Sequence, residues 1–240
     1  MHVKRPANCG IARQLDICDY TTLSSTRRPL ERAQSVNMLF SEFDRAVTGR
    51  NLFKVDTIGD AYIIVGWLHK NHCPSESWDA SSLACWAGMA EATRDLELED
   101  VQQCADMLCV AGDMLEIVNR LRSQTTIHWN VRIGIAIGSV IAGMLGKHQM
   151  RFSVLGEVMQ HIARLETMGQ PGRVHCSADF VNFVSSRLEG RRCLEQWHVE
   201  RVDNDATSEG RSLGQVQLRS FMLSRIIQND QMDAVSPHST

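Results

Sequence analysis

The stretch 51–62, NLFKVDTIGDAY, predicts two strands joined by a tight turn. Apolar residues dominate both halves, and the Gly-Asp pair between them is typical of a hairpin. Lys54 and Asp56 place charges in the first strand, and Asp60 stands at the tip of the turn. Aspartate suits turns because its side chain hydrogen-bonds to nearby backbone, so Asp60 alone indicates no function.

The composition predicts one globular domain. The chain has 240 residues, of which 43% are hydrophobic and 22% charged, and this is ordinary for a soluble protein with one core. The net charge of −3 argues against electrostatic binding to nucleic acid or anionic membranes, which needs a basic surface. No apolar run approaches the roughly 20 residues that cross a bilayer. We expect a cytoplasmic protein, or the cytoplasmic part of a larger membrane-linked one.

The cysteine pattern indicates free thiols. Eight cysteines are present, but none form a CxxC pair and no histidines follow them at zinc-finger spacing. We therefore expect a reducing compartment and no metal knuckle.

Helical and extended patterns alternate along the chain. A helix is expected from Pro29 to Gly49, because apolar residues between them recur with the 3.6-residue period. A second helical pattern runs from Leu83 to about Leu121, with a break near 97–100. Further strands are expected in IARQLDICDY, WNVRIGIAIGSVIAGMLG, RFSVLG, GRVHCS and QVQLRSFMLSR, and further helices in EVMQHIARLETMG and ADFVNFVSSRLE. Hairpins occur together with crossovers, so we expect an α+β sandwich with one largely antiparallel sheet.

Two carboxylates are candidates for a metal site. Asp16 ends the first strand pattern and Asp60 ends another. Carboxylates that end neighbouring strands could hold Mg²⁺ or Mn²⁺, which take oxygen ligands and often share them with substrate phosphates. Their spacing in the sequence alone does not show that they meet.

Five segments together resemble a known family. In chain order they are LDICDYTTLSS, FKVDTIGDAYIIVG, VRIGIAIGSVIAGMLG, RFSVLGEVMQHIARLET and PGRVHCS. Over about residues 11–225 the chain resembles the catalytic domain of class III nucleotide cyclases. The resemblance implies a ferredoxin-like-derived α+β sandwich, with a mostly antiparallel sheet flanked by helices. We expect this domain at 11–226 with an insertion at about 69–100, after a loose leader at 1–10 and before a disordered tail at 227–240.

The resemblance also implies a reaction. In this family the ribose 3′-oxygen attacks the α-phosphorus of a nucleoside triphosphate and expels pyrophosphate. Two ions, Mg²⁺ or Mn²⁺, would be held by Asp16, Asp60 and the backbone carbonyl of Ile17. One ion would lower the pKa of the 3′-hydroxyl, and the other would neutralise the β- and γ-phosphates.

Asp56 stands at the family's base-reading position. Adenylate-forming relatives usually have lysine there and guanylate-forming relatives glutamate. Guanine N1–H and N2–H₂ are donors that a carboxylate accepts, whereas adenine N1 is an acceptor. Ser153 occupies the partner position, and its hydroxyl suits either base. We therefore expect GTP as the substrate and cyclic GMP as the product.

Other positions of the family pattern are only partly retained. Gln160 and Arg164 stand where the family has an asparagine that orients the ribose and an arginine that contacts the phosphates. Gln160 moves the amide outward by one methylene, and Asp19 replaces a glycine near the triphosphate, so both put full activity in doubt. Arg211 is a weak candidate for a further triphosphate contact, and Arg219 a weaker one.

The family builds its sites between two domains, with the metals from one and the Asn–Arg pair from the other. This chain has versions of both sets, which implies a homodimer, or a heterodimer with another cyclase domain. Two alternatives to a guanylate cyclase stay open. One is an adenylate cyclase that tolerates Asp56, and the other is a degenerate domain that regulates a partner without turnover.

Overall fold

The structure is a computed structural model that describes residues 9–18, 20, 28–68, 90–202 and 219–226. Its centre is a seven-stranded sheet in the order β2-β3-β1-β4-β7-β9-β8. Every neighbouring pair is antiparallel except β4 and β7, which are parallel. The strands are β1 (Cys9–Ile17), β2 (Phe53–Ile58), β3 (Ala61–Leu68), β4 (Val131–Gly138), β7 (Val174–Ser177), β8 (Trp197–Val202) and β9 (Ser220–Arg225).

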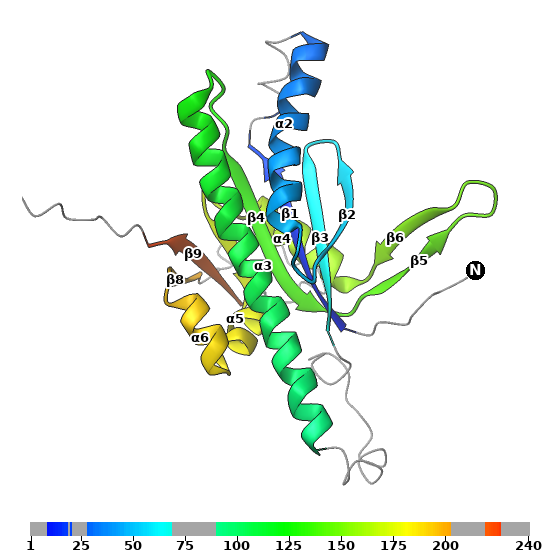
Figure 1. Ribbon diagram of the computed structural model, residues 1–240, viewed down its shortest axis with the longest axis vertical. Coiled ribbons are helices and arrows are strands. Elements are labelled where there is room, and N and C mark those ends of the chain that lie inside the picture. Colours follow the sequence, from blue (N-terminus) through cyan, green and yellow to red (C-terminus); the bar gives the residue numbers. More distant parts are fainter. Residues whose placement is uncertain (1–8, 19, 21–27, 69–89, 203–218, 227–240) are drawn as a thin grey trace, which may run out of the picture.

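Helices cover both faces of this sheet (Figure 1). The helices are α2 (Pro29–Val47), α3 (Ala90–Gln124), α4 (Glu157–Thr167), α5 (Ala178–Ser185) and α6 (Leu188–Leu194). The larger core cluster joins α2, α3, α5 and α6 to one face, and a smaller cluster joins α4 to the other. The predicted α+β sandwich is thereby confirmed. None of the helices in the described ranges is long and apolar enough to cross a membrane.

Helix α4 lies directly on the central strands. A Cβ atom added at Gly134 of β4 would lie 2.4 Å from the carbonyl oxygen of Ile162 and 2.6 Å from the backbone nitrogen of Glu166. Real Cβ atoms do not approach backbone this closely, so glycine is needed here. The close contact fixes α4 against the strand that runs beside β1.

The predicted hairpin at 51–62 is confirmed. β2 and β3 meet at Gly59, whose φ of 65° is a conformation that glycine adopts freely. The register shifts between Lys54 and Asp56, so an extra residue lies in β2. Lys54 reaches the α2 side of the sheet, where its ammonium is 2.7 Å from Asp44 Oδ1. The side chains of Lys54 and Asp56 therefore point to opposite faces of the sheet.

A separate two-stranded ribbon, β5 (Ile141–Leu145) and β6 (Arg151–Leu155), projects from the body of the molecule (Figure 1). The Phe152 ring on this ribbon contacts the ring of Phe53 on β2, with centroids 5.2 Å apart. Much of its apolar surface is exposed, at Ile141, Met144, Met150, Phe152 and Leu155. A projecting ribbon with this composition is typical of a surface that meets another protein.

Some predicted boundaries were wrong. α3 begins at Ala90 and runs without the break expected near 97–100, so the last part of the expected insertion belongs to this helix. Asp100, within that stretch, is buried rather than in a loop. β1 begins at Cys9, inside the expected leader. Residues 69–89, 1–8 and 227–240, which make up the rest of the insertion, of the leader and of the expected tail, lie outside the described residues.

The C-terminal part also differs from prediction. The helix expected in ADFVNFVSSRLE is two helices, because Arg187 between them has the extended φ/ψ of −121° and 155°. β8 was not predicted at all. Four consecutive residues of β8 are exposed, His198 to Arg201, and its apolar alternation stops after Val199, which is too short to indicate a strand by itself.

Candidate active site

Asp16 and Asp60 lie together at one end of the sheet. β1 pairs with β3 in antiparallel register, which brings the end of β1 next to the β2–β3 turn that carries Asp60. The pKa of Asp16 is raised to about 6, first by burial and then by the negative charges of Asp60 and Glu166, and a side-chain hydrogen bond with Asp60 adds to the shift. The two carboxylates that the sequence singled out are therefore neighbours.

Arg132 is a third component of this cluster, and sequence reasoning missed it. It lies opposite Asp16 in the β1–β4 pairing. Its Nη2 donates to Asp16 Oδ2 at 3.2 Å, and its Nε donates to Glu166 Oε1 at 2.7 Å. The guanidinium thus joins a strand-end carboxylate to a buried carboxylate on α4. No local pattern indicated it, because its contacts depend on the β1–β4 register and on the packing of α4.

The donor set suits a hard divalent cation. Two acidic side chains held side by side repel each other, and a cation between them would remove the repulsion that raises the pKa of Asp16. No group of three or more His, Cys, Asp or Glu side chains gathers for a metal within the described ranges. A complete shell would therefore need backbone oxygen, such as that of Ile17, and oxygens from water or a substrate.

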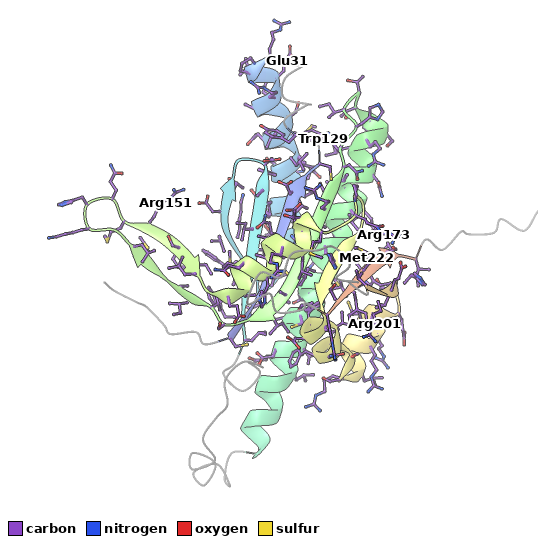
Figure 2. The ribbon with its side chains drawn as sticks, turned by 180° about the vertical axis from the view of Figure 1, so that it is seen from behind. Glu31, Trp129, Arg151, Arg173, Arg201 and Met222 are labelled. Atoms are coloured by element: carbon purple, nitrogen blue, oxygen red, sulfur yellow. The ribbon has the colours of Figure 1, made fainter. Side chains whose placement is uncertain are left out.

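Asp56 lies apart from this cluster and is paired with Arg151. Arg151 Nη2 on β6 lies 3.0 Å from Asp56 Oδ2 on β2. The other carboxylate oxygen of Asp56 accepts the backbone N–H of Thr57 at 2.8 Å. Figure 2 labels Arg151 on the projecting ribbon. Ser153 is two residues along β6 and therefore on the same side of the strand as Arg151.

Gln160 and Arg164 are exposed on α4. They are one turn apart and share a face, as the spacing predicted. The opposite face of the helix is buried, through Val158, Ile162 and Leu165. Because that buried face packs on the sheet, the Gln160 and Arg164 side chains point away from the sheet of their own chain.

A family model for the adenylate and guanylate cyclase catalytic domain matches residues 3–217. The chain belongs to this family. That finding confirms the resemblance inferred from the five sequence segments.

Guanylate cyclases are among the curated relatives. Bovine retinal guanylyl cyclase 2 is 28% identical over 175 residues, which cover 73% of this chain and 14% of that protein. The receptor-type guanylate cyclase gcy-7 of Caenorhabditis elegans is 31% identical over 167 residues, which cover 68% of this chain and 12% of the relative. The chain thus spans only a small part of the length of the relatives it matches.

Solved cyclase domains share the fold. The guanylate cyclase domain of RhGC from Catenaria anguillulae in complex with GTP has a TM-score of 0.64 at 19% identity, covering 91% of this chain and 97% of that one. The adenylyl cyclase CyaB from P. aeruginosa has a TM-score of 0.61 at 13% identity, covering 92% and 96%. Identities this low establish the fold alone.

Of the remaining candidates of this cyclase domain, only Arg219 lies within the described residues, and it is not brought to the carboxylate cluster. Asp19 and Arg211 lie outside the described residues. Arg219 is exposed and immediately precedes β9, and β4 and β7 lie between β9 and β1 in the sheet order. Its backbone carbonyl accepts a hydrogen bond from Ala178. Two residues that sequence reasoning did not name, Arg132 and Arg151, instead contact the predicted site.

Proposed function

We propose that this domain is a guanylate cyclase, which converts GTP to cyclic GMP and pyrophosphate in a site formed between two copies of the chain. The observation that carries the proposal is the Asp56 carboxylate held by Arg151 at 3.0 Å. An acidic side chain at the base-reading position favours guanine, and the family membership and the named relatives support the reaction class.

The Asp56 carboxylate discriminates by hydrogen bonding. It accepts from guanine N1–H and N2–H₂, while the Ser153 hydroxyl donates to guanine O6. Adenine would place its N1 acceptor against the same carboxylate, so the adenine nitrogen would find no donor there, at a cost of about 1–3 kcal/mol. Arg151 and the Thr57 N–H each hold one carboxylate oxygen, which limits rotation of the acid toward an alternative partner.

Asp16 and Asp60 are the proposed metal ligands, with the carbonyl of Ile17. Bound Mg²⁺ or Mn²⁺ would lower the pKa of the 3′-hydroxyl and neutralise the negative charge of the phosphates. Asp16 is already partly buried and held by Arg132, so its carboxylate is directed before substrate arrives. The two like charges side by side give the site an affinity for cationic ligands.

A second copy would supply the phosphate-binding side. Arg164 points away from its own sheet, and in a dimer it would face the triphosphate held by the other chain, where its charge stabilises the transition state. Gln160, one turn earlier, would orient the ribose. The exposed apolar residues of the β5–β6 ribbon give a surface that such a dimer would cover.

The test is identification of the cyclic product. The purified chain is incubated with Mn²⁺ and either GTP or ATP, and the nucleotides are separated and identified by mass. We expect cyclic GMP from GTP and at least tenfold less cyclic AMP from ATP, because about 1.4 kcal/mol corresponds to a factor of ten. Cyclic AMP alone would overturn the base assignment, and no turnover of either would favour a regulatory domain.

A further inference from the structure

Two thiols face each other on the side of the sheet opposite α4. Cys109 on α3 and Cys193 on α6 are 84 residues apart in sequence, yet their sulfur atoms lie 3.7 Å apart. The Cys193 sulfur also lies 3.7 Å from the carbonyl oxygen of Ala105, one turn before Cys109. Cys193 is buried, and Cys109 keeps partial exposure. The Cys193 thiol on α6 therefore contacts the turn of α3 that runs from Ala105 to Cys109.

We propose that Cys109 and Cys193 are an oxidation site, at which a low-molecular-weight disulfide such as oxidised glutathione converts the two thiols to a disulfide between α3 and α6. The contact at 3.7 Å places both sulfurs in van der Waals contact before oxidation. A disulfide is about 2.05 Å long, so the side chains must approach further, and the two helices that carry them are already packed together.

The two sulfurs differ in exposure and in their electrostatic environment. The pKa of Cys109 is lowered to about 7, mainly by the hydrogen bond with Cys193 and further by the positive charge of Arg50, against the effect of burial. The pKa of Cys193 is raised, first by the same hydrogen bond and then by burial. Because Cys109 is partly exposed whereas Cys193 is buried, an external disulfide reaches Cys109 first, so Cys109 attacks and Cys193 resolves the intermediate.

The chemistry balances without any further reactant. The Cys109 thiolate attacks one sulfur of oxidised glutathione, which forms a mixed disulfide and releases one glutathione thiolate. Cys193 then gives its proton to water and attacks the Cys109 sulfur, which releases the second glutathione thiolate. Two protein thiols are oxidised, and one disulfide is reduced to two thiols.

Among the described residues, the other cysteines are all buried and lack this combination. Cys104 and Cys176 are buried, and burial raises the pKa of each thiol, so neither is a ready nucleophile. We therefore expect oxidised glutathione to react with Cys109 in preference to Cys104 and Cys176. The new bond would also constrain the unfolded chain across a long loop and raise the melting temperature by about 5 °C or more.

The experiment uses the full reduced chain and oxidised glutathione as the probe. Unreacted thiols are blocked after a time course, and disulfides are mapped by peptide mass spectrometry without reduction. We expect a Cys109–Cys193 disulfide as the main product and a higher melting temperature that reductant reverses. The Cys193→Ser variant should instead accumulate glutathione on Cys109, because no resolving thiol remains. Cys176→Ser is the matched control and should behave like the parent chain.

Three outcomes would overturn the proposal. One is glutathione on Cys193 with Cys109 unreacted, which would reverse the assigned roles. Another is a main disulfide between other cysteines. The third is no modification of Cys109 in either the parent chain or the Cys193→Ser variant, under conditions in which an unfolded sample of the same chain reacts.

Discussion

The guanidinium of Arg132 on β4 donates to the carboxylate of Asp16, the proposed metal ligand on β1, at 3.2 Å. The same guanidinium donates to Glu166, whose side chain is 6% exposed. The pKa of Arg132 is raised, mainly by its hydrogen bond with Glu166. Arg132 thus neutralises two carboxylates that come from β1 and α4.

Replacing Arg132 should destabilise the domain through Glu166. Arg132→Met leaves a buried carboxylate without its partner, and we expect the free energy of unfolding to fall by about 3 kcal/mol. Adding Glu166→Gln in the same chain removes the unpaired charge and should recover at least half of the loss. Urea unfolding of the three proteins measures both effects. If the double variant is no more stable than Arg132→Met, the proposed role of Glu166 is wrong.

His175 should make stability fall in mild acid. Its Nδ1 donates to the Leu165 carbonyl at 2.8 Å, and in the neutral ring its Nε2 accepts from the Ser220 hydroxyl at 2.9 Å. Burial lowers its pKa below the usual 6.5. As pH falls below 6.5 the unfolded chain therefore binds a proton that the folded chain does not, and folded stability decreases by up to about 1.4 kcal/mol per pH unit.

The His175→Gln variant isolates this contribution. Glutamine can donate to the same carbonyl and accept from the same hydroxyl, but it does not titrate. Urea unfolding at pH 7.5 and 5.5 should show a smaller loss of stability in the variant than in the parent chain. Equal losses in the two proteins would show that His175 stays neutral in both states or protonates equally in both.

Local sequence signals predicted the hairpin and most strands. The Gly59–Asp60 turn is specified by neighbouring residues, so it was predicted correctly. The strand β8 was missed because its apolar alternation stops after Val199. The break predicted near 97–100 was wrong, since α3 is continuous there and Asp100 is buried within it. Polar residues alone therefore do not distinguish a loop from an exposed strand or from a helix that buries a charged side chain.

The contacts within the site depend on strand pairing between distant residues, so the sequence alone could not predict them. Sequence spacing could not show that Asp16 meets Asp60, since the meeting depends on the register between β1 and β3. Arg151 was missed for a similar reason. Its contact with Asp56 joins two strands that belong to different sheets, and no local pattern links residues 95 positions apart. The outward direction of Gln160 and Arg164, in contrast, follows from the helical period.

Asp56 should control the choice of base. Asp56→Lys replaces an acceptor with a donor, and we expect kcat/KM for GTP to fall about 100-fold while that for ATP falls less or rises. Arg151→Ala should lower kcat/KM for GTP about tenfold, because the Asp56 carboxylate remains but is less well positioned. Steady-state kinetics with both nucleotides measures the ratio.

The neighbouring Lys54 provides the control for this prediction. It lies on the opposite face, where it pairs with Asp44, and Lys54→Met should leave the ratio of GTP to ATP use unchanged. A change of that ratio in Lys54→Met as large as that in Asp56→Lys would contradict a specific role for Asp56.

Gln160→Asn should raise the turnover of GTP. The shorter amide lies closer to the position that the family uses, and rates are sensitive to displacements of about 1 Å, so we expect kcat to increase about tenfold. The exposed Gln170, beyond the end of α4, is a matched control, and Gln170→Asn should change nothing. A fall in kcat for Gln160→Asn would indicate that this chain positions the ribose by another group.

Mixing two inactive variants tests the shared site most directly. Asp60→Ala removes a proposed metal ligand, and Arg164→Ala removes the proposed phosphate contact, so each homodimer should be inactive. In a mixed dimer one of the two sites keeps Asp60 from one chain and Arg164 from the other. Equal amounts, unfolded together and refolded, should therefore form cyclic GMP at about a quarter of the parent rate. A mixture no more active than the variants measured separately would contradict the account.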